Sequence, residues 1–305
     1  RRLPGILLLT VATLIVVVAL LVSGLRLVLP QLNSWRPQVL EKVSAMAGVP
    51  VDASNIVASW QTFGPTLDVR DVKAGLNDGG ELSAKRVTLA LDVWQSLLHM
   101  RWQFRDLTFW QLQVHTNTPI QTNNSGEGLK TDRISDLFLR QFDHFILRDS
   151  HLSFLTISGQ RAELAIPQLT WLNGKNRHRA EGQLSLSSLT GQHGVMQVRM
   201  DLRDEDGLLN KGRVWLQADD IDVKPWLGRW MQDNIALQSA RFSLEGWMTI
   251  DKGDVASGDV WLKKGGASWQ GDKEKHHLSV DNLTAHIYRD NQSWGFHIPD
   301  TRISM

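Results

Sequence analysis

The sequence contains no cysteine, which excludes a disulfide framework and any metal site built from thiolates. An excess of charge of one sign is also missing, because 33 Lys and Arg stand against 32 Asp and Glu. Without Arg1, Arg2 and Arg26, which flank the first apolar segment, 30 basic residues remain against 32 acidic ones. A surface for nucleic acid is not expected, since such surfaces carry a strong positive excess.

Motifs of catalysis and metal binding are also lacking. The ten histidines form no HExxH and no cluster with carboxylates at ligand spacing. His276 and His277 follow "GDKEK", a predicted hairpin tip, and are interpreted as solvated. There is no GxSxG, P-loop or dinucleotide-binding glycine motif, and "DEDG" at 204–207 matches only a fragment of a calcium loop and is interpreted as a turn. We expect no enzyme activity, no cofactor and no metal.

One long apolar run is present at the N-terminus. Residues 3–25 carry no charge over 23 positions, which as a helix reach about 34 Å, enough to cross a bilayer. A cleaved signal peptide is the alternative, but its apolar run is shorter, and Val22-Ser23-Gly24 is a poor cleavage site. Residues 1–29 are therefore predicted to be a transmembrane anchor. Arg1 and Arg2 before the run favour a cytoplasmic N-terminus and an extracytoplasmic remainder.

A short helix is predicted after the anchor, within residues 30–48. Apolar residues recur at helical spacing from Leu32 and Trp35 onward, and Gly48 with Pro50 ends the pattern. Two interpretations stay open. The helix packs on the following sheet, or it lies at the membrane surface with Trp35 at the depth of the headgroups.

From Val51 onward the apolar residues alternate with polar ones, as in half-buried strands. "VMQVRMDLRD" (195–204) is the clearest example. Strands are predicted at 51–60, 66–76, 82–93, 102–116, 145–156, 162–171, 180–189, 195–203, 212–220, 240–250, 257–263, 277–287 and 294–303. Turn motifs at 77–80, 173–176, 204–207, 251–254, 263–266 and 289–291 predict an antiparallel meander.

Only three further helices are predicted, at 93–100, 132–142 and 223–231, and they are too short to cover a dozen strands. The polar run at 116–131 is interpreted as a loop. The chain ends within an alternating segment, which suggests the front part of a longer protein.

A local pattern recurs in the strands: alternating apolar residues, then two polar ones, the second an Asp or Asn. The two polar residues shift the alternation by one position, as a β-bulge does. Chance is the alternative explanation for the repeat. The second polar residues are Asp71, Asp106, Asp149, Asp220 and Asn282.

The stretch "VPVDASNIVASWQTFGPTLDVRDV" (49–72), preceded by an anchor and a short helix ending in glycine, resembles the N-terminal signature of the AsmA-like family. The segments "SLLHMRWQFRDLTFWQLQVHTNT", "ISDLFLRQFDHF", "GQRAELAIPQLTWLN" and "SLTGQHGVMQVRMDLRD" resemble one long bacterial inner-membrane member of that family. The resemblance covers essentially all of the chain. It implies a bridge-like lipid transporter, in which a twisted β groove crosses the periplasm and carries phospholipid toward the outer membrane.

The expected fold is therefore mainly β: a transmembrane helix (1–29), a juxtamembrane helix (30–48), and a long curled antiparallel sheet over 49–305 that forms an open apolar groove. The expected partners are phospholipid acyl chains, the inner membrane and envelope proteins, and no nucleic acid. The residues expected to line the groove are Met196, Val198, Met200, Leu202, Val214, Leu216, Phe242, Leu244, Met248, Ile250, Val260 and Leu262.

Two competing functions stay open at this point. The same apolar residues would form the core of a sealed β-sandwich, and a membrane-anchored scaffold for envelope assembly would use such a core. A cell-wall hydrolase would need two facing carboxylates, and no such pair is identified by the sequence.

Overall fold

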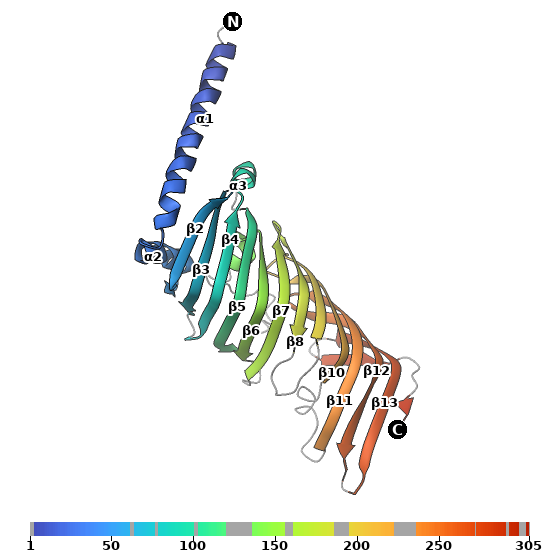
Figure 1. The fold of residues 1–305 in the computed structure, drawn as a ribbon. Coiled ribbons are helices and arrows are strands. Elements are labelled where there is room, and N and C mark those ends of the chain that lie inside the picture. The colour runs from blue at the N-terminus through green and yellow to red at the C-terminus, as the bar shows by residue number, and fades with distance from the viewer. Residues whose placement is uncertain are drawn as a thin grey trace.

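The computed structural model describes residues 3–61, 64–76, 79–100, 103–119, 136–155, 161–185, 195–222, 236–271, 273–290, 293–298 and 303–304. Two helical segments precede a single long sheet, which twists along its length so that its last strands lie far from the N-terminal helix (Figure 1). The C-terminus lies at the distal end of the sheet.

Helix α1 (Leu3–Val28) stands away from the sheet, and none of its residues is buried. Together with the 3-10 turn η1 (Leu29–Gln31) it makes one helical segment that is long and apolar enough to cross a membrane. The exposed side chains of α1 are mostly Leu, Ile and Val, as expected for a helix that is surrounded by lipid.

The helix predicted within residues 30–48 is present as α2 (Arg36–Ala47), although it begins later than expected. Leu32 and Trp35 lie in a turn before it, and a proline in its first turn costs no hydrogen bond there. Gly48 ends the helix with a φ of +73°, a conformation that favours glycine. Ala47 packs with Val49, which follows the helix, and with Ala74 of β3, so the C-terminal end of α2 packs on the sheet.

All fifteen described strands belong to one sheet, in which strands adjacent in sequence mostly pair with each other. The strands are β1 (Val51–Asp52), β2 (Asn55–Gln61), β3 (Gly64–Gly75), β4 (Glu81–Leu91), β5 (Phe104–Pro119), β6 (His144–Leu155), β7 (Arg161–Asn173), β8 (Arg177–Ser185), β9 (Val195–Arg203), β10 (Lys211–Asp222), β11 (Ala236–Asp251), β12 (Asp254–Gln270), β13 (Lys275–Asp290), β14 (Ser293–His297) and β15 (Ile303–Ser304). Strands β1 and β2 both pair with β3, and β15 pairs with β13 beside β14.

The expectation of a purely antiparallel sheet is wrong at one place. Strands β5 and β6 pair in parallel, with Thr108 opposite Ile146. A parallel pair cannot be joined by a tight turn, because the chain must return to the same end of the sheet. The connection here includes the single π-helical turn η2 (Leu137–Gln141), the described part of the helix predicted at 132–142.

The turn predicted at 263–266 is also wrong, because these residues belong to strand β12. The turns at 173–176, 204–207 and 251–254 lie between strands as predicted. The predicted helix at 93–100 is confirmed as α3 (Val93–His99). The helix predicted at 223–231 lies outside the described residues, and so does most of the loop predicted at 116–131, whose first residues belong to β5.

Candidate functional site: the apolar inner face of the sheet

One face of the sheet, here called the inner face, carries the apolar side chains of nearly every strand. Directly paired residues of neighbouring strands point to the same side of a sheet. Met200 pairs with Val214, which pairs with Met248, and in the next rows Val198 pairs with Leu216 and Met196 with Ala218. By this register all twelve residues predicted to line a groove lie on the inner face.

The inner face is only partly covered. Val198 and Leu202 are buried, whereas the other ten predicted residues are half-buried. Because every described strand belongs to the same sheet, no second sheet among the described residues seals this face. The sealed sandwich is therefore not the observed architecture.

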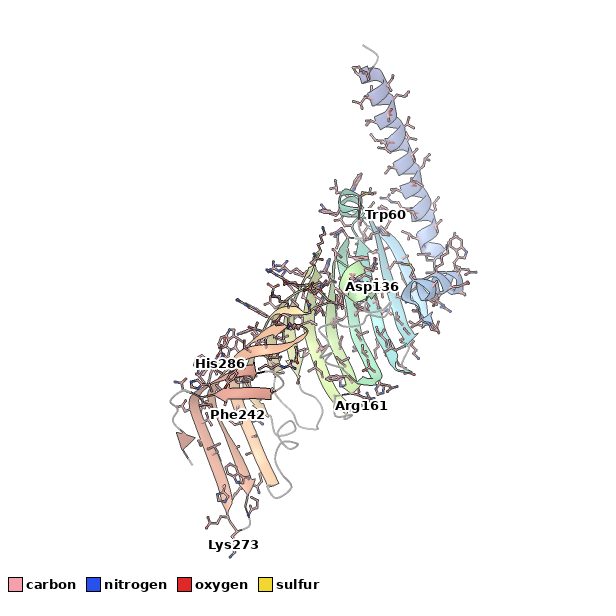
Figure 2. All side chains as sticks on the ribbon, turned by 180° about the vertical axis from the view of Figure 1, so that it is seen from behind. Trp60, Asp136, Arg161, Phe242, Lys273 and His286 are labelled. Atoms are coloured by element: carbon pink, nitrogen blue, oxygen red, sulfur yellow. The ribbon has the colours of Figure 1, made fainter. Side chains whose placement is uncertain are left out.

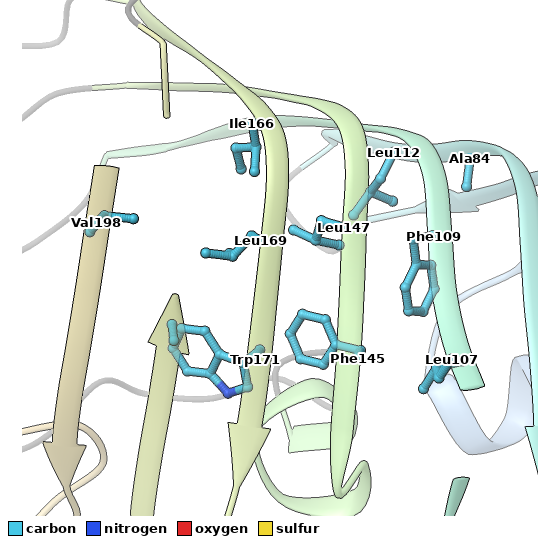
Figure 3. Close-up of a cluster of buried hydrophobic side chains, with 11 residues drawn as sticks. Ala84, Leu107, Phe109, Leu112, Phe145, Leu147, Ile166, Leu169, Trp171 and Val198 are labelled. Atoms are coloured by element: carbon cyan, nitrogen blue, oxygen red, sulfur yellow. The ribbon is translucent and has the colours of Figure 1, made fainter. Parts of the chain in front are cut away.

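The apolar surface extends well beyond the predicted residues, toward the membrane-proximal strands. A buried cluster on β4 to β9 holds Ala84, Leu107, Phe109, Leu112, Phe145, Leu147, Ile166, Leu169, Trp171, Ala180 and Val198 (Figure 3). Phe145 and Trp171 stack with their ring planes 10° apart. The alternation in "LTFWQLQV" and "AIPQLTW" places Leu107 with Phe109 and Leu169 with Trp171 on one face. Leu112 and Ile166 join that face only through a shift of the alternation by one residue.

The π-helical turn η2 covers part of this cluster. The ring of Phe138 lies 5.2 Å from that of Phe109 and 5.1 Å from that of Phe145, measured between centroids. The side chain of Asn173, at the end of β7, holds the turn in place by donating to the carbonyl oxygens of Phe138 and Phe142, at 2.6 and 2.8 Å. The periodicity of one sequence segment could not predict this contact, because it joins residues 31 and 35 positions apart.

A cavity of about 500 Å³ lies between α2 and η2. Met46 of α2 and Phe104 and Phe142 give it apolar walls, while Asp136 and Gln141 of the η2 segment add polar atoms. The hollow therefore lies beside the start of β5.

Glycines on the inner face mark where neighbouring strands approach closely. A Cβ atom at Gly182 on β8 would lie 2.3 Å from the carbonyl oxygen of Gln168 on β7. Gly246 on β11 lies in the same row, through Val198 and Leu216, but its nearest neighbour would be 3.8 Å away. Similarly close approaches occur between β9 and β10 at Gly212 and between β11 and β12 at Gly265, whereas no neighbouring atom crowds Gly246.

Two lines of irregular pairing, here called creases, cross the sheet. The first crease runs over β3 to β7 through Asp71, Lys85, Gln111, Asp149 and Pro167. The second crease runs over β10 to β13 through Asp220, Ser243, Lys263 and Asn282.

Left-handed backbone conformations cause the slip in alternation at the creases. Asp71, Asp149 and Asn282 have φ values of +50°, +46° and +62°, and Asp220 has +50°. Asp and Asn tolerate this conformation better than other residues with a Cβ. On β13, for example, Val280 and Leu283 both lie on the inner face, with two outward residues between them.

The five predicted irregular positions are confirmed, with a correction to their kind. Asp220 and Asp106 lie at or beside bulges in which two residues oppose one. At Asp71, Asp149 and Asn282 both strands skip one residue instead. The repeated polar pair thus marks the places where the alternation of inward and outward side chains shifts by one residue.

The outer face of the sheet carries the charges. Arg86 donates to both carboxylate oxygens of Asp68, from Nη2 to Oδ2 at 2.9 Å and from Nε to Oδ1 at 3.2 Å. A hydrogen bond from Arg177 lowers the pKa of Asp201, and one from Trp215 lowers the pKa of Glu245. These carboxylates stay ionised at neutral pH, so water contacts the outer face while the inner face is left apolar.

The outer face also bears a hollow of about 880 Å³ over β7 to β11. Arg199 lies over the ring of Trp215 there, 5.4 Å from its centroid, and pairs with Glu181 at 3.3 Å. Its charged and amide side chains make it unsuited to acyl chains. In the part of the chain that the structure describes, no group of three or more His, Asp or Glu is placed to hold a metal ion, and His276 and His277 are exposed.

Comparisons with known proteins agree with the architecture. The family model described as YhdP protein matches residues 1–305. The chain is 74% identical over 305 residues to a protein of Escherichia coli strain K12 named intermembrane phospholipid transporter YhdP. The alignment covers all of this chain but 24% of that relative, so the chain spans about a quarter of its length. No solved structure matches. The chain belongs to the YhdP family.

Proposed function

We propose that this chain is the membrane-anchored front part of a bridge-like conduit that carries phospholipid between the inner and outer membranes, with the acyl chains lying along the inner face. The observation that carries the proposal is the apolar face itself, which continues over β3 to β13 in a single layer and is half-buried along much of its length. The relative named a phospholipid transporter supports lipid as the cargo.

The energetics favour such a face as a path for lipid. Exposing an acyl chain of about fifteen methylenes to water costs roughly 12 kcal/mol, at about 0.8 kcal/mol for each. A continuous apolar surface removes most of that barrier, because the chain never leaves an apolar environment. The methionines of the face suit a variable ligand, since their side chains are flexible and polarizable.

The geometry of the sheet supports a path that runs across the strands. Thirteen strands in one path, spaced about 4.8 Å apart, extend about 58 Å in the hydrogen-bonding direction. Lipid would move across the strands, along the line that joins α1 to the distal strands. The remaining three quarters of the length of the Escherichia coli relative would then continue the path between the membranes.

The proposed location is the bacterial inner membrane, crossed once by α1, with the N-terminus in the cytoplasm and the sheet in the periplasm. Arg1 and Arg2 precede the span and Arg26 follows it, which favours this orientation. No catalytic step is assigned to the chain. Envelope proteins that connect the conduit to the outer membrane are further proposed partners.

Native mass spectrometry of the purified protein tests this function directly. Phospholipid should remain bound. Met196→Glu places a charge on the inner face and should abolish lipid retention, because an unpaired ion in an apolar site costs several kcal/mol. Gln197→Glu, the next residue on the same strand, points outward and should retain lipid.

A preparation of folded protein without lipid would contradict the conduit and favour the scaffold. Equal retention in both variants would show that the lipid is bound elsewhere. Circular dichroism must show an intact sheet in the Met196→Glu variant before its lipid content is interpreted.

A further inference from the structure

Helix α3 exposes an apolar side that no described part of the chain covers. The exposed fractions are 62% for Trp94, 61% for Leu97, 74% for Leu98 and 88% for Met100. Within the helix, Trp94, Leu97 and Leu98 fall in an arc of about 100°, at 100° per residue. Four large apolar side chains exposed together on one short segment mark an interaction surface.

The other side of α3 is polar and binds the sheet. Asp92 caps the helix by accepting from the backbone N–H of Gln95, at 3.0 Å. The hydroxyl of Ser96 accepts from the backbone N–H of Gln103, at 2.9 Å, and so fixes the helix to the start of β5. The apolar side is therefore held outward by the polar contacts of the opposite side.

The position of α3 places this apolar side next to the membrane span. Arg26, near the end of α1, lies over the ring of Trp60 on β2, 5.8 Å from its centroid. Trp60 pairs with the start of β3, where a Cβ atom at Gly64 would meet the carbonyl oxygen of Leu91, the last residue of β4 before α3. The end of α1, the tip of β2 and β3, and α3 are thus neighbours.

Figures 1 and 2, which differ by a half turn about the vertical axis, both place α3 level with the C-terminal part of α1. Trp60 is labelled just beside α3 in Figure 2. A bilayer that surrounds the uncharged residues of α1 therefore reaches the level of α3.

We propose that α3 inserts its apolar side into the outer leaflet of the same bilayer that α1 crosses, as a second membrane contact. The proposal rests on the membrane span assigned to α1 under the proposed function. A single helix leaves the sheet free to tilt relative to the membrane plane, whereas a second contact limits that tilt. The first strands of the inner face are then held close to the membrane surface with which they would exchange lipid.

Fluorescence quenching in liposomes of phosphatidylethanolamine and phosphatidylglycerol tests this insertion. The chain has no cysteine, so a single one can be introduced into the whole chain and labelled with an environment-sensitive dye. Leu98→Cys reports the apolar side of α3, and Gln95→Cys reports its polar side. Val16→Cys lies within α1, and Lys273→Cys lies at the distal tip of the sheet (Figure 2).

The dye at Leu98 should show blue-shifted emission and strong quenching by lipids with a nitroxide on the acyl chain, as at Val16. The dye at Gln95 should be quenched more weakly, and the dye at Lys273 should not be quenched. Quenching at Val16 without quenching at Leu98 would overturn the insertion of α3 and leave the span intact. Absence of quenching at Val16 would instead overturn the proposed span.

Discussion

Gly182→Ala should destabilise the sheet, whereas Gly246→Ala should not. The two glycines lie in one row of the inner face, so both substitutions add the same methyl group to the same face of the sheet. They differ in space, since the new Cβ at Gly182 would lie 2.3 Å from the carbonyl oxygen of Gln168 and 2.7 Å from the Cα of Leu169. At Gly246 the nearest atom would be 3.8 Å away.

The magnitude follows from these distances. An ordinary contact needs 3.4 Å or more, so β8 must move about 1 Å away from β7, and overpacking of this kind costs about 1–3 kcal/mol. At Gly246 the substitution should be neutral or stabilising by about 0.5–1 kcal/mol, because alanine loses less chain entropy on folding. For a domain of this size, 1 kcal/mol corresponds to about 2–4 °C in Tm.

Thermal unfolding in detergent, followed by tryptophan fluorescence, measures the difference. The Gly182→Ala protein should melt roughly 2–10 °C below the parent, and Gly246→Ala should melt at the same temperature or slightly above it. Equal Tm values for the two variants would refute the conclusion that the neighbouring strand leaves no room for a Cβ atom at Gly182 but leaves room for one at Gly246.

Three further predictions concern the creases, the turn η2 and pH. Asp149→Val should lower the free energy of unfolding by about 1–2 kcal/mol in denaturant titration, because a β-branched residue is strained at a φ of +46°, while Asp149→Asn should change it little. Asn173→Ala should cost about 2–5 kcal/mol in the same titration, since it leaves buried polar groups without partners, and the exposed Asn176→Ala should be nearly silent. The hydrogen bond to Asp143 raises the pKa of His144 above 6.5, so the stabilisation is complete below that pH and is lost as the pH rises through the raised pKa. Melting curves of His144→Gln between pH 5 and pH 8 should lack this loss, and an unchanged pH dependence would contradict the assignment.

The alternation of apolar and polar residues in the sequence was sufficient to predict the strands and which of their residues share the inner face. Met196, Val198 and Met200 lie where the alternation placed them, because one-step alternation decides the facing of a strand residue. The polar pairs ending in Asp149 and Asn282 carried enough information to predict where the phase changes, since few residues accept a left-handed backbone.

Non-local contacts limited the prediction elsewhere. The parallel pairing of β5 and β6 depends on how the connecting segment crosses the sheet, and no local pattern records that crossing. The contacts of the Phe138 ring with Phe109 and Phe145 depend on the same segment between β5 and β6. "KKGG" at 263–266 has the composition of a turn, yet it stays within β12 because strands on both sides pair with it.

Site-specific photo-crosslinking in living cells tests the central claim most directly, namely that acyl chains lie on the inner face. A crosslinker at Met200, which is half-buried on that face, should capture phospholipid. A crosslinker at Arg199, the preceding residue on the outer face, should capture none. Equal capture from both positions, or capture from neither in a protein that accumulates normally, would contradict the account.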